Sequence, residues 1–372
     1  MNDDFTGNAR HSRLAQFHID TPLLLGLLAL IGFGLMVLYS ASGQSIVMME
    51  RQMIRLGIAL AVMVAFAQIK PQTLKRWSFP LFLVGVALLV AVMLVGSVGK
   101  GAQRWLDLGF MMFQPSEVMK LAVPMAVAWF ISSHSLPPRI WHLLGGALLC
   151  VVPTLLIAQQ PDLGTSILIA TAGVFVLFLS GMSWRLIAVV AGLISAFLPI
   201  LWLFLMREYQ RQRVLTFLNP ESDPLGSGYH IIQSKIAIGS GGFDGKGWLH
   251  GTQSQLEFLP ERHTDFIFAV LSEEFGMLGV LILLAIYLFI IVRCMIISSR
   301  AQDNYSKLVA GSFTLTFFVY VFVNIGMVSG LLPVVGVPLP LVSFGGTSMV
   351  TLMAAFGVIM SVGTHKRMLA AP

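Results

Sequence analysis

The chain has 372 residues, of which 56% are hydrophobic and only 11% are charged, and its mean hydropathy is +0.84. Soluble domains carry about 25% charged residues, so this composition excludes an ordinary soluble globular protein. The formal net charge of +6 does not indicate nucleic-acid binding, because the basic residues are scattered between apolar segments. That pattern is typical of a membrane protein that faces anionic lipid.

Ten apolar segments are candidates to cross a bilayer, for which about 20 residues are needed. They lie near residues 22–41, 54–69, 79–98, 117–132, 143–158, 165–180, 186–206, 266–292, 308–331 and 344–364. Several are short, which tilted helices accommodate. We therefore predict an all-α, polytopic transmembrane helix bundle of about ten spans, with residues 1–372 forming a single integral membrane domain.

The Lys and Arg residues indicate how this bundle is oriented. An even number of spans puts both termini on one side, and cytoplasmic termini place twelve Lys and Arg in the inner segments against five in the short outer ones. Cytoplasmic loops carry the basic excess, so we predict a cytoplasmic tail at residues 1–21 and a large periplasmic loop at 207–265. Thirteen of the seventeen acidic residues then lie on the outer side, where we expect any chemistry to occur.

Three predicted spans, which start near residues 117, 165 and 344, begin at the outer face behind proline and polar residues that are typical of helix starts. Free backbone N–H groups and the positive end of the helix dipole favour anions there. Ordinary capping explains any one of these starts. The three together, with basic residues nearby, predict an anion-binding region.

Four side chains in this region are candidates for substrate binding. Glu117 and Lys120 are three residues apart and share one helix face. They form either a self-neutralising pair or a substrate site in which Lys120 meets a phosphate and Glu117 orients it or a sugar hydroxyl. Arg104 suits phosphate, and Trp105 suits either a sugar face or the membrane interface.

Asp265 lies where the polar loop gives way to the apolar run that starts at Phe266. Partial desolvation raises the pKa of a carboxylate, which makes it a better general base. The alternative role is an N-cap on the eighth span. Glu273 and Glu274 are unusual in a span, and they predict that this stretch starts as a partly wet or re-entrant helix.

The long loop holds three further patterns. Residues 230–238 suit a short amphipathic helix at the membrane interface. Residues 239–247 lack the Gly and the Ser or Thr that a nucleotide-binding P-loop requires, so their glycines are predicted to form tight turns. His230 and His263 have no chelating spacing, and we predict no metal ligation by histidine.

The sequence resembles the SEDS family (shape, elongation, division and sporulation) over its whole length, and most closely the elongation branch found in Gram-negative rods. The motifs that carry the resemblance are Ser40-Ala41-Ser42-Gly43, Lys100-Gly101-Ala102-Gln103-Arg104-Trp105, Gln114-Pro115-Ser116-Glu117, Gln160-Pro161-Asp162-Leu163-Gly164-Thr165-Ser166, His263-Thr264-Asp265-Phe266-Ile267-Phe268 and Ser343-Phe344-Gly345-Gly346.

This resemblance implies a peptidoglycan glycosyltransferase of the bacterial inner membrane, which polymerises lipid II into β-1,4 glycan strands for cell elongation and rod shape. It implies a class B penicillin-binding transpeptidase as partner, together with other elongation-complex proteins. Asp265 matches the family's essential loop aspartate and Trp105 its functionally sensitive tryptophan. The residues expected to bind substrate are Arg104, Trp105, Glu117, Lys120, Asp162, Arg211, Arg213, Lys235 and His263.

The implied reaction is an inverting transfer in which the 4-hydroxyl of one lipid-linked disaccharide attacks the anomeric carbon of another. One base is needed, and Asp265 is expected to supply it. The leaving lipid pyrophosphate needs positive charge from Lys120, Arg104, helix N-termini or a divalent cation. The sequence requires no cofactor and leaves the divalent cation open.

Two alternatives to a polymerase are a lipid II flippase and a non-catalytic scaffold that activates the penicillin-binding protein. Transporters place charges near the membrane midplane on broken helices, whereas most charges here lie at the outer boundary. Glu273 and Glu274 are the residues that favour a flippase. A scaffold has no need for an outward base beside basic residues.

Overall fold

The computed structural model describes residues 17–365, except residues 100–101, 108, 110–111, 161, 207, 223–226, 257 and 260. Residues 1–16 of the predicted tail, Lys100 and Gly101 of the first loop motif, and Pro161 therefore lie outside the described residues.

Ten helices follow the ten predicted spans. They are α2 (Thr21–Ala41), α3 (Ile46–Gln68), α4 (Pro71–Val95), α5 (Pro115–Ser132), α6 (Ile140–Gln159), α7 (Leu163–Leu179), α8 (Trp184–Ile200), α12 (Ile267–Ser299), α13 (Asn304–Val328) and α14 (Thr347–Thr364). Seven of them, namely α2, α4, α6, α8, α12, α13 and α14, are long and apolar enough to cross a membrane, and α7 is a shorter apolar helix. The all-α polytopic membrane bundle predicted from the sequence is confirmed.

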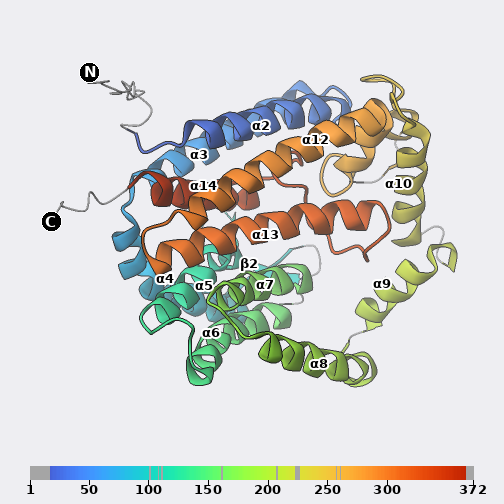
Figure 1. Cartoon of the computed structure of the whole chain (residues 1–372). Coiled ribbons are helices and arrows are strands. Elements are labelled where there is room, and N and C mark those ends of the chain that lie inside the picture. The colour runs from blue at the N-terminus through green and yellow to red at the C-terminus, as the bar shows by residue number, and fades with distance from the viewer. Residues whose placement is uncertain are drawn as a thin grey trace, which may run out of the picture.

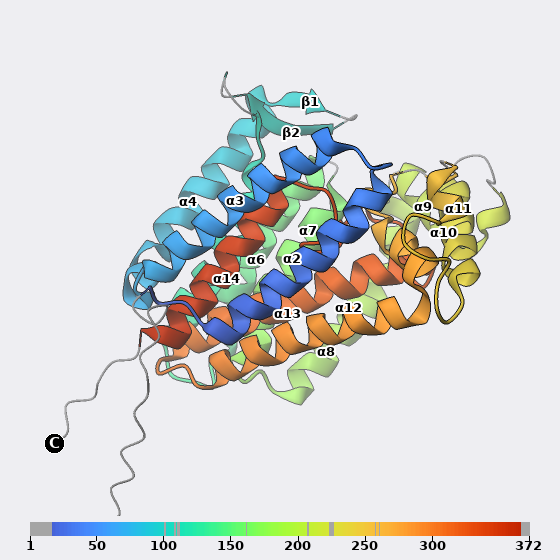
Figure 2. The same cartoon turned by 90° about the horizontal axis from the view of Figure 1, so that it is seen from above.

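The remaining elements gather at one end of the bundle, which we call the loop end (Figure 2). They are the antiparallel strands β1 (Ser97–Gly99), β2 (Ala102–Asp107) and β3 (Met112–Phe113), and the helices η1 (Leu201–Leu205), α9 (Glu208–Leu218), η2 (Pro220–Ser222), α10 (Ser227–Gly241) and α11 (Thr252–Gln255). At the opposite end the rings of His18 and His365 stack with centroids 3.7 Å apart. Both ends of the described chain therefore meet, as an even number of spans requires.

The helix α13 lies at the centre of the bundle, where α5, α7, α12 and α14 pack around it (Figure 1). Its most hydrophobic stretch is two-thirds buried, at 67%. The helix α8 differs: none of the described side chains in its hydrophobic stretch is buried, and it lies along the edge of the molecule (Figure 1).

The helix α12 is interrupted at Gly276, whose φ of 59° and ψ of −158° are not helical. The predicted re-entrant start stays a prediction, since the break shows only that α12 is not one regular helix. The prediction of a partly wet start is wrong, because residues 267–274 are all buried and the side chain of Glu273 is 0% exposed. Protein, not water, surrounds this part of α12.

The glycine-rich loop at residues 242–247 repairs the interruption. A helix break frees carbonyl groups before it and N–H groups after it, and a membrane offers no water to bind them. The loop supplies partners for two groups on each side, through Lys246 N to Glu273 O (3.0 Å), Gly247 N to Glu274 O (3.0 Å), Met277 N to Gly242 O (3.0 Å) and Leu278 N to Phe243 O (3.2 Å). Positive φ values at Gly242, Gly245 and Gly247 confirm the predicted tight turns.

Residues 230–238, predicted as an interfacial amphipathic helix, belong to α10. The helix is confirmed, but its buried face meets protein, because α10 packs on α12 and α13. The buried Ser234 donates a hydrogen bond to the Val328 carbonyl at 2.8 Å, which ties the loop to the end of α13.

Replacing Gly276 by alanine tests the constraint at the break. An added Cβ would lie 2.3 Å from Gly245 N and 2.5 Å from Phe243 O, and the backbone angles are accessible essentially to glycine alone. We expect Gly276→Ala to destabilise the fold by about 2–4 kcal/mol, measured as a lower thermal unfolding midpoint in detergent. Gly239→Ala is the control, because an added Cβ there meets nothing within 4 Å. Equal midpoints for the two variants would contradict this account of the break.

Candidate functional site

Asp265 lies in a turn, two residues before α12 begins. The N-cap of α12 is Phe266, with no side-chain capping bond, so the alternative interpretation of Asp265 as the helix cap is wrong. The side chain is partly exposed, and its Oδ2 lies 3.4 Å from the point where a Cβ on Gly336 would stand. The carboxylate therefore lies against Gly336, which has no side chain.

The segment of residues 263–265, here called the Asp265 loop, is held in place through hydrogen bonds that its three backbone carbonyls accept. Asn324 donates from its Nδ2 to the Asp265 carbonyl at 2.9 Å and to the Val337 carbonyl at 2.7 Å. Ser343 Oγ donates to the Thr264 carbonyl at 2.6 Å, and Phe344 N donates to the His263 carbonyl at 2.8 Å. The Asp265 loop is thus fixed to α13 and to the segment that precedes α14.

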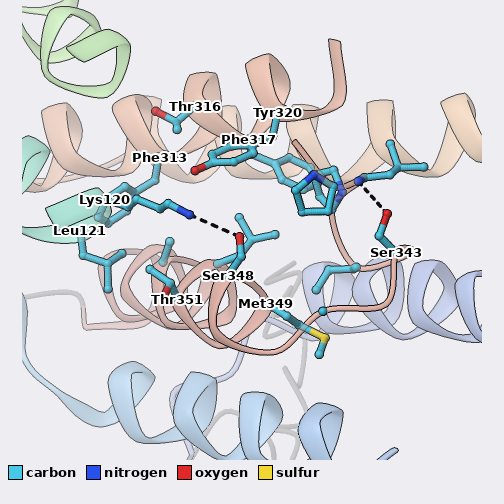
Figure 3. A pocket seen from close by; sticks show the side chains of 17 residues that line it. Lys120, Leu121, Phe313, Thr316, Phe317, Tyr320, Ser343, Ser348, Met349 and Thr351 are labelled. Carbon is cyan, nitrogen blue, oxygen red and sulfur yellow. Dashed lines mark hydrogen bonds between the residues drawn. The ribbon is translucent and has the colours of Figure 1, made fainter. Parts of the chain in front are cut away.

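A pocket opens beside this loop between α5, α13 and α14 (Figure 3). Most of its wall is apolar, from residues such as Leu121, Phe313, Phe317 and Leu352. Its polar side chains come from three helices and a loop, and they are Lys120, Thr316, Tyr320, Ser343, Ser348 and Thr351. We call this cavity the Lys120 pocket. Its cavity volume of about 60 Å³ is several times what one water molecule needs.

Lys120 and Glu117 form an ion pair at the wall of the pocket. The Lys120 Nζ to Glu117 Oε1 distance is 2.8 Å, and the side chains are 13% and 10% exposed. Lys120 also donates to Ser348 Oγ at 3.4 Å, and Thr351 Oγ1 donates to Glu117 Oε2 at 3.2 Å. The predicted self-neutralising pair is confirmed, and Lys120 also lines the cavity; its contact with a substrate phosphate stays a prediction.

The Lys120 pocket and the Asp265 loop form one site. Tyr320 lines the pocket and Asn324 binds the loop, and four residues of α-helix span about 6 Å. Ser343 also belongs to both, since it lines the pocket and holds the Thr264 carbonyl. The loop that carries Asp265 thus adjoins the pocket that Lys120 lines.

A second polar cluster joins the β-strands to α5 and α7 at the loop end. Asp162 caps α7 by accepting from Thr165 N at 3.2 Å, and it pairs with Arg104 at 3.6 Å. Gln114 Nε2 also donates to Asp162, at 3.4 Å. Trp105 follows Arg104 in β2 and is partly exposed, opposite Ser97 of β1. Three predicted motif segments meet here, with the Asp162 carboxylate engaged by protein groups.

Other residues expected to bind substrate lie elsewhere. Arg211 in α9 donates to the Leu203 carbonyl at 2.9 Å, and Lys235 is exposed on α10 beside Gly330. The backbone of Arg213 belongs to α9, and its side chain lies outside the description. The His263 ring packs edge-on against Phe344 with centroids 6.0 Å apart, so it helps to seat the Asp265 loop. Substrate contacts by these four residues stay predictions.

In the described part of the chain, no three His, Cys, Asp or Glu side chains come together in a group that could hold a metal ion. A divalent cation at the leaving group stays an untested possibility.

Sequence reasoning missed the residues that join the site together. Tyr320 and Asn324 sit inside an apolar span, Ser348 was interpreted only as part of a helix start, and Thr351 was not singled out. The available signal was spacing, because polar residues four apart in a membrane span share one face and polar groups in spans mark function.

Comparisons with known proteins define the class. Residues 20–368 match the model of the cell cycle protein family that comprises FtsW, RodA and SpoVE. The chain is 60% identical over 352 residues to peptidoglycan glycosyltransferase MrdB of Escherichia coli K12, covering 95% of both chains. It is 35% identical to a probable peptidoglycan glycosyltransferase FtsW of Trichlorobacter lovleyi, covering 94% of both.

Solved structures agree. A chain in a structure described as "Structural coordination of polymerization and crosslinking by a peptidoglycan synthase complex" superimposes with a TM-score of 0.80 at 33% identity, covering 93% of this chain and 97% of that one. The rod shape determining protein RodA of Thermus thermophilus gives a TM-score of 0.70 at 28% identity, with 93% and 96% covered. The fold and site thus define a polytopic membrane protein of the SEDS type. The chain belongs to the FtsW/RodA/SpoVE family.

The buried ion pair gives a stability prediction. Lys120→Met leaves the Glu117 carboxylate without its cation in a place where it is 10% exposed, and breaking a buried pair costs about 3–5 kcal/mol. The double variant Glu117→Gln/Lys120→Met removes both charges and should recover most of that loss. Thermal unfolding in detergent measures both. A single variant as stable as the unchanged protein would show that the pair is not a buried one.

Proposed function

We propose that this chain is a peptidoglycan glycosyltransferase that polymerises lipid II into β-1,4 glycan strands at the periplasmic face of the bacterial inner membrane, with Asp265 as the general base. The observation that carries the proposal is the fixed Asp265 loop beside the Lys120 pocket. A partly exposed carboxylate stands next to an amphipathic cavity that opens within the membrane bundle. A lipid-linked sugar diphosphate likewise combines a polar, charged part with an apolar chain.

In this reaction the 4-hydroxyl of the acceptor sugar attacks the anomeric carbon of the donor. The Asp265 carboxylate takes the hydroxyl proton as the new glycosidic bond forms. The bond between the anomeric carbon and the diphosphate oxygen breaks, the lipid diphosphate leaves, and the configuration at the anomeric carbon is inverted. Lys120, which binds Glu117 and Ser348 at the pocket wall, lies where its ammonium group can approach that diphosphate, while the apolar wall of the pocket suits the lipid chain.

A class B penicillin-binding transpeptidase is the proposed partner, acting with other proteins of the elongation complex. The supporting observation is that a structurally similar chain comes from a peptidoglycan synthase complex in which polymerisation and crosslinking are coordinated.

A lipid II flippase is the alternative that the interrupted helix α12 favours. Glu273, however, accepts from Lys246 at 2.7 Å, Thr252 at 3.1 Å, Gln253 N at 2.9 Å and Ser254 N at 3.3 Å. Glu274 accepts from Ser40. These carboxylates fasten the loop and α2 to α12, so their structural work accounts for their burial without a transport role. A scaffold without catalysis leaves the fixed, partly exposed carboxylate unexplained.

Asp265→Asn tests the base directly. The amide keeps the size of the side chain and leaves the backbone bonds to Asn324 intact, but it cannot accept the proton. We expect glycan polymerisation from lipid II by the purified variant to fall by a factor of about 10²–10⁴, with an unchanged unfolding midpoint. Retention of more than about a tenth of the unchanged protein's turnover would remove Asp265 from the role of base.

The orientation is tested by cysteine labelling. Asp244→Cys, on the exposed glycine-rich loop, and Gln302→Cys, between α12 and α13, are each placed in a chain whose buried Cys150 and Cys294 are changed to alanine. A membrane-impermeant thiol reagent should label residue 244 in intact spheroplasts and residue 302 only after the membrane is broken. The reverse pattern would put the Asp265 loop in the cytoplasm, and the proposed function would fail with it.

A further inference from the structure

Arg55, in the third turn of α3, lies against the site although it belongs to none of the predicted motifs. Its guanidinium carbon stands 4.6 Å from the centre of the Phe344 ring, within the range of a cation–π contact. The guanidinium also lies 3.6–3.8 Å from the point where a Cβ on Gly346 would stand. Phe344 contacts His263 as well, so this arginine is coupled to the Asp265 loop through one aromatic ring.

The charge balance of the site makes Arg55 different from the other cations. Lys120 is paired with Glu117 at 2.8 Å and Arg104 with Asp162 at 3.6 Å, so neither contributes net positive charge. Within the described part of the chain, Arg55 has no carboxylate within 4.0 Å. An arginine is always charged, and a charge near the membrane with no opposite charge beside it points to a functional partner.

The surroundings of Arg55 leave room for that partner. The first turn of α14 begins at Gly346 without a side-chain cap, so its N–H groups are not taken by a capping residue. An added Cβ at Gly345 meets nothing within 4 Å, so there is open space at the residue before the one that the guanidinium contacts. The planar guanidinium can bind a phosphate through two N–H groups at once.

We propose that Arg55, seated on Phe344 beside the open backbone of residues 345–346, binds the diphosphate of a lipid-linked substrate. The inference rests on the proposed function, because joining two lipid-linked sugars brings two diphosphates to the site. Arg55 lies by residue 346 and Lys120 by Ser348. The two cations therefore contact different residues at the start of α14, and we assign one of them to each diphosphate.

The test is equilibrium binding of farnesyl diphosphate to the protein in phosphatidylcholine nanodiscs. Arg55→Gln should weaken binding at least tenfold, and Arg55→Lys should weaken it less, because lysine keeps the charge without the planar pair of donors. Arg51→Gln is the matched control: Arg51 is exposed, one turn earlier on the same helix, and its loss should change binding less than twofold. Unfolding midpoints equal to that of the unchanged protein show that each variant is folded.

Two results would overturn the proposal. One is an equal effect, or no effect, of the changes at residues 51 and 55. The other is a loss of phosphatidylglycerol binding as large as the loss of farnesyl diphosphate binding, which would make Arg55 a general lipid-headgroup contact. Polymerisation from lipid II is measured in parallel. If the unchanged protein binds the diphosphate through Arg55 but makes no glycan, the proposed function fails while this site stands.

Discussion

The backbone break in α12 is the constraint on which the rest of the site depends. At Gly276 the chain leaves helical geometry inside a membrane bundle, where unsatisfied N–H and C=O groups have no water to bind. The glycine-rich loop supplies partners for these groups through four hydrogen bonds. Since that loop must reach the break, the loop end folds back onto the bundle and buries residues 267–274, which we call the plug. Asp265 lies two residues before the plug begins.

Burial of the plug separates the charged residues into two groups. Glu273 holds Lys246 and the start of α11, and Asp162 holds α7 and Arg104, so these carboxylates stabilise the architecture. Asp265 and Arg55 are held by other means, the first through its backbone carbonyl and the second by an aromatic ring. The Asp265 carboxylate lies by Gly336 and the Arg55 guanidinium by Gly346. A buried polar residue, Asn324 (0% exposed), holds the Asp265 loop from the last turns of α13.

Hydropathy predicted the helices well, because about 20 apolar residues leave few choices besides a span. Glu273 and Glu274 marked the start of α12 as unusual for a span, but no sequence pattern located the interruption at Gly276. Contacts between distant segments could not be predicted from the sequence. The residues around Asn324 do not indicate that its amide binds the carbonyls of residues 265 and 337. Arg55 counted in the sequence only toward topology, since its contact with Phe344 joins segments 289 residues apart in the chain. The burial of residues 267–274 likewise depends on the returning loop.

The central claim is that this molecule makes glycan and does not merely move its precursor. The most direct measurement reconstitutes the purified protein in liposomes with lipid II and follows two products together: glycan strands, and lipid II that has crossed the bilayer. The account predicts glycan strands and no acceleration of crossing over protein-free vesicles. Accelerated crossing with no glycan, in a preparation shown to be folded, would contradict it.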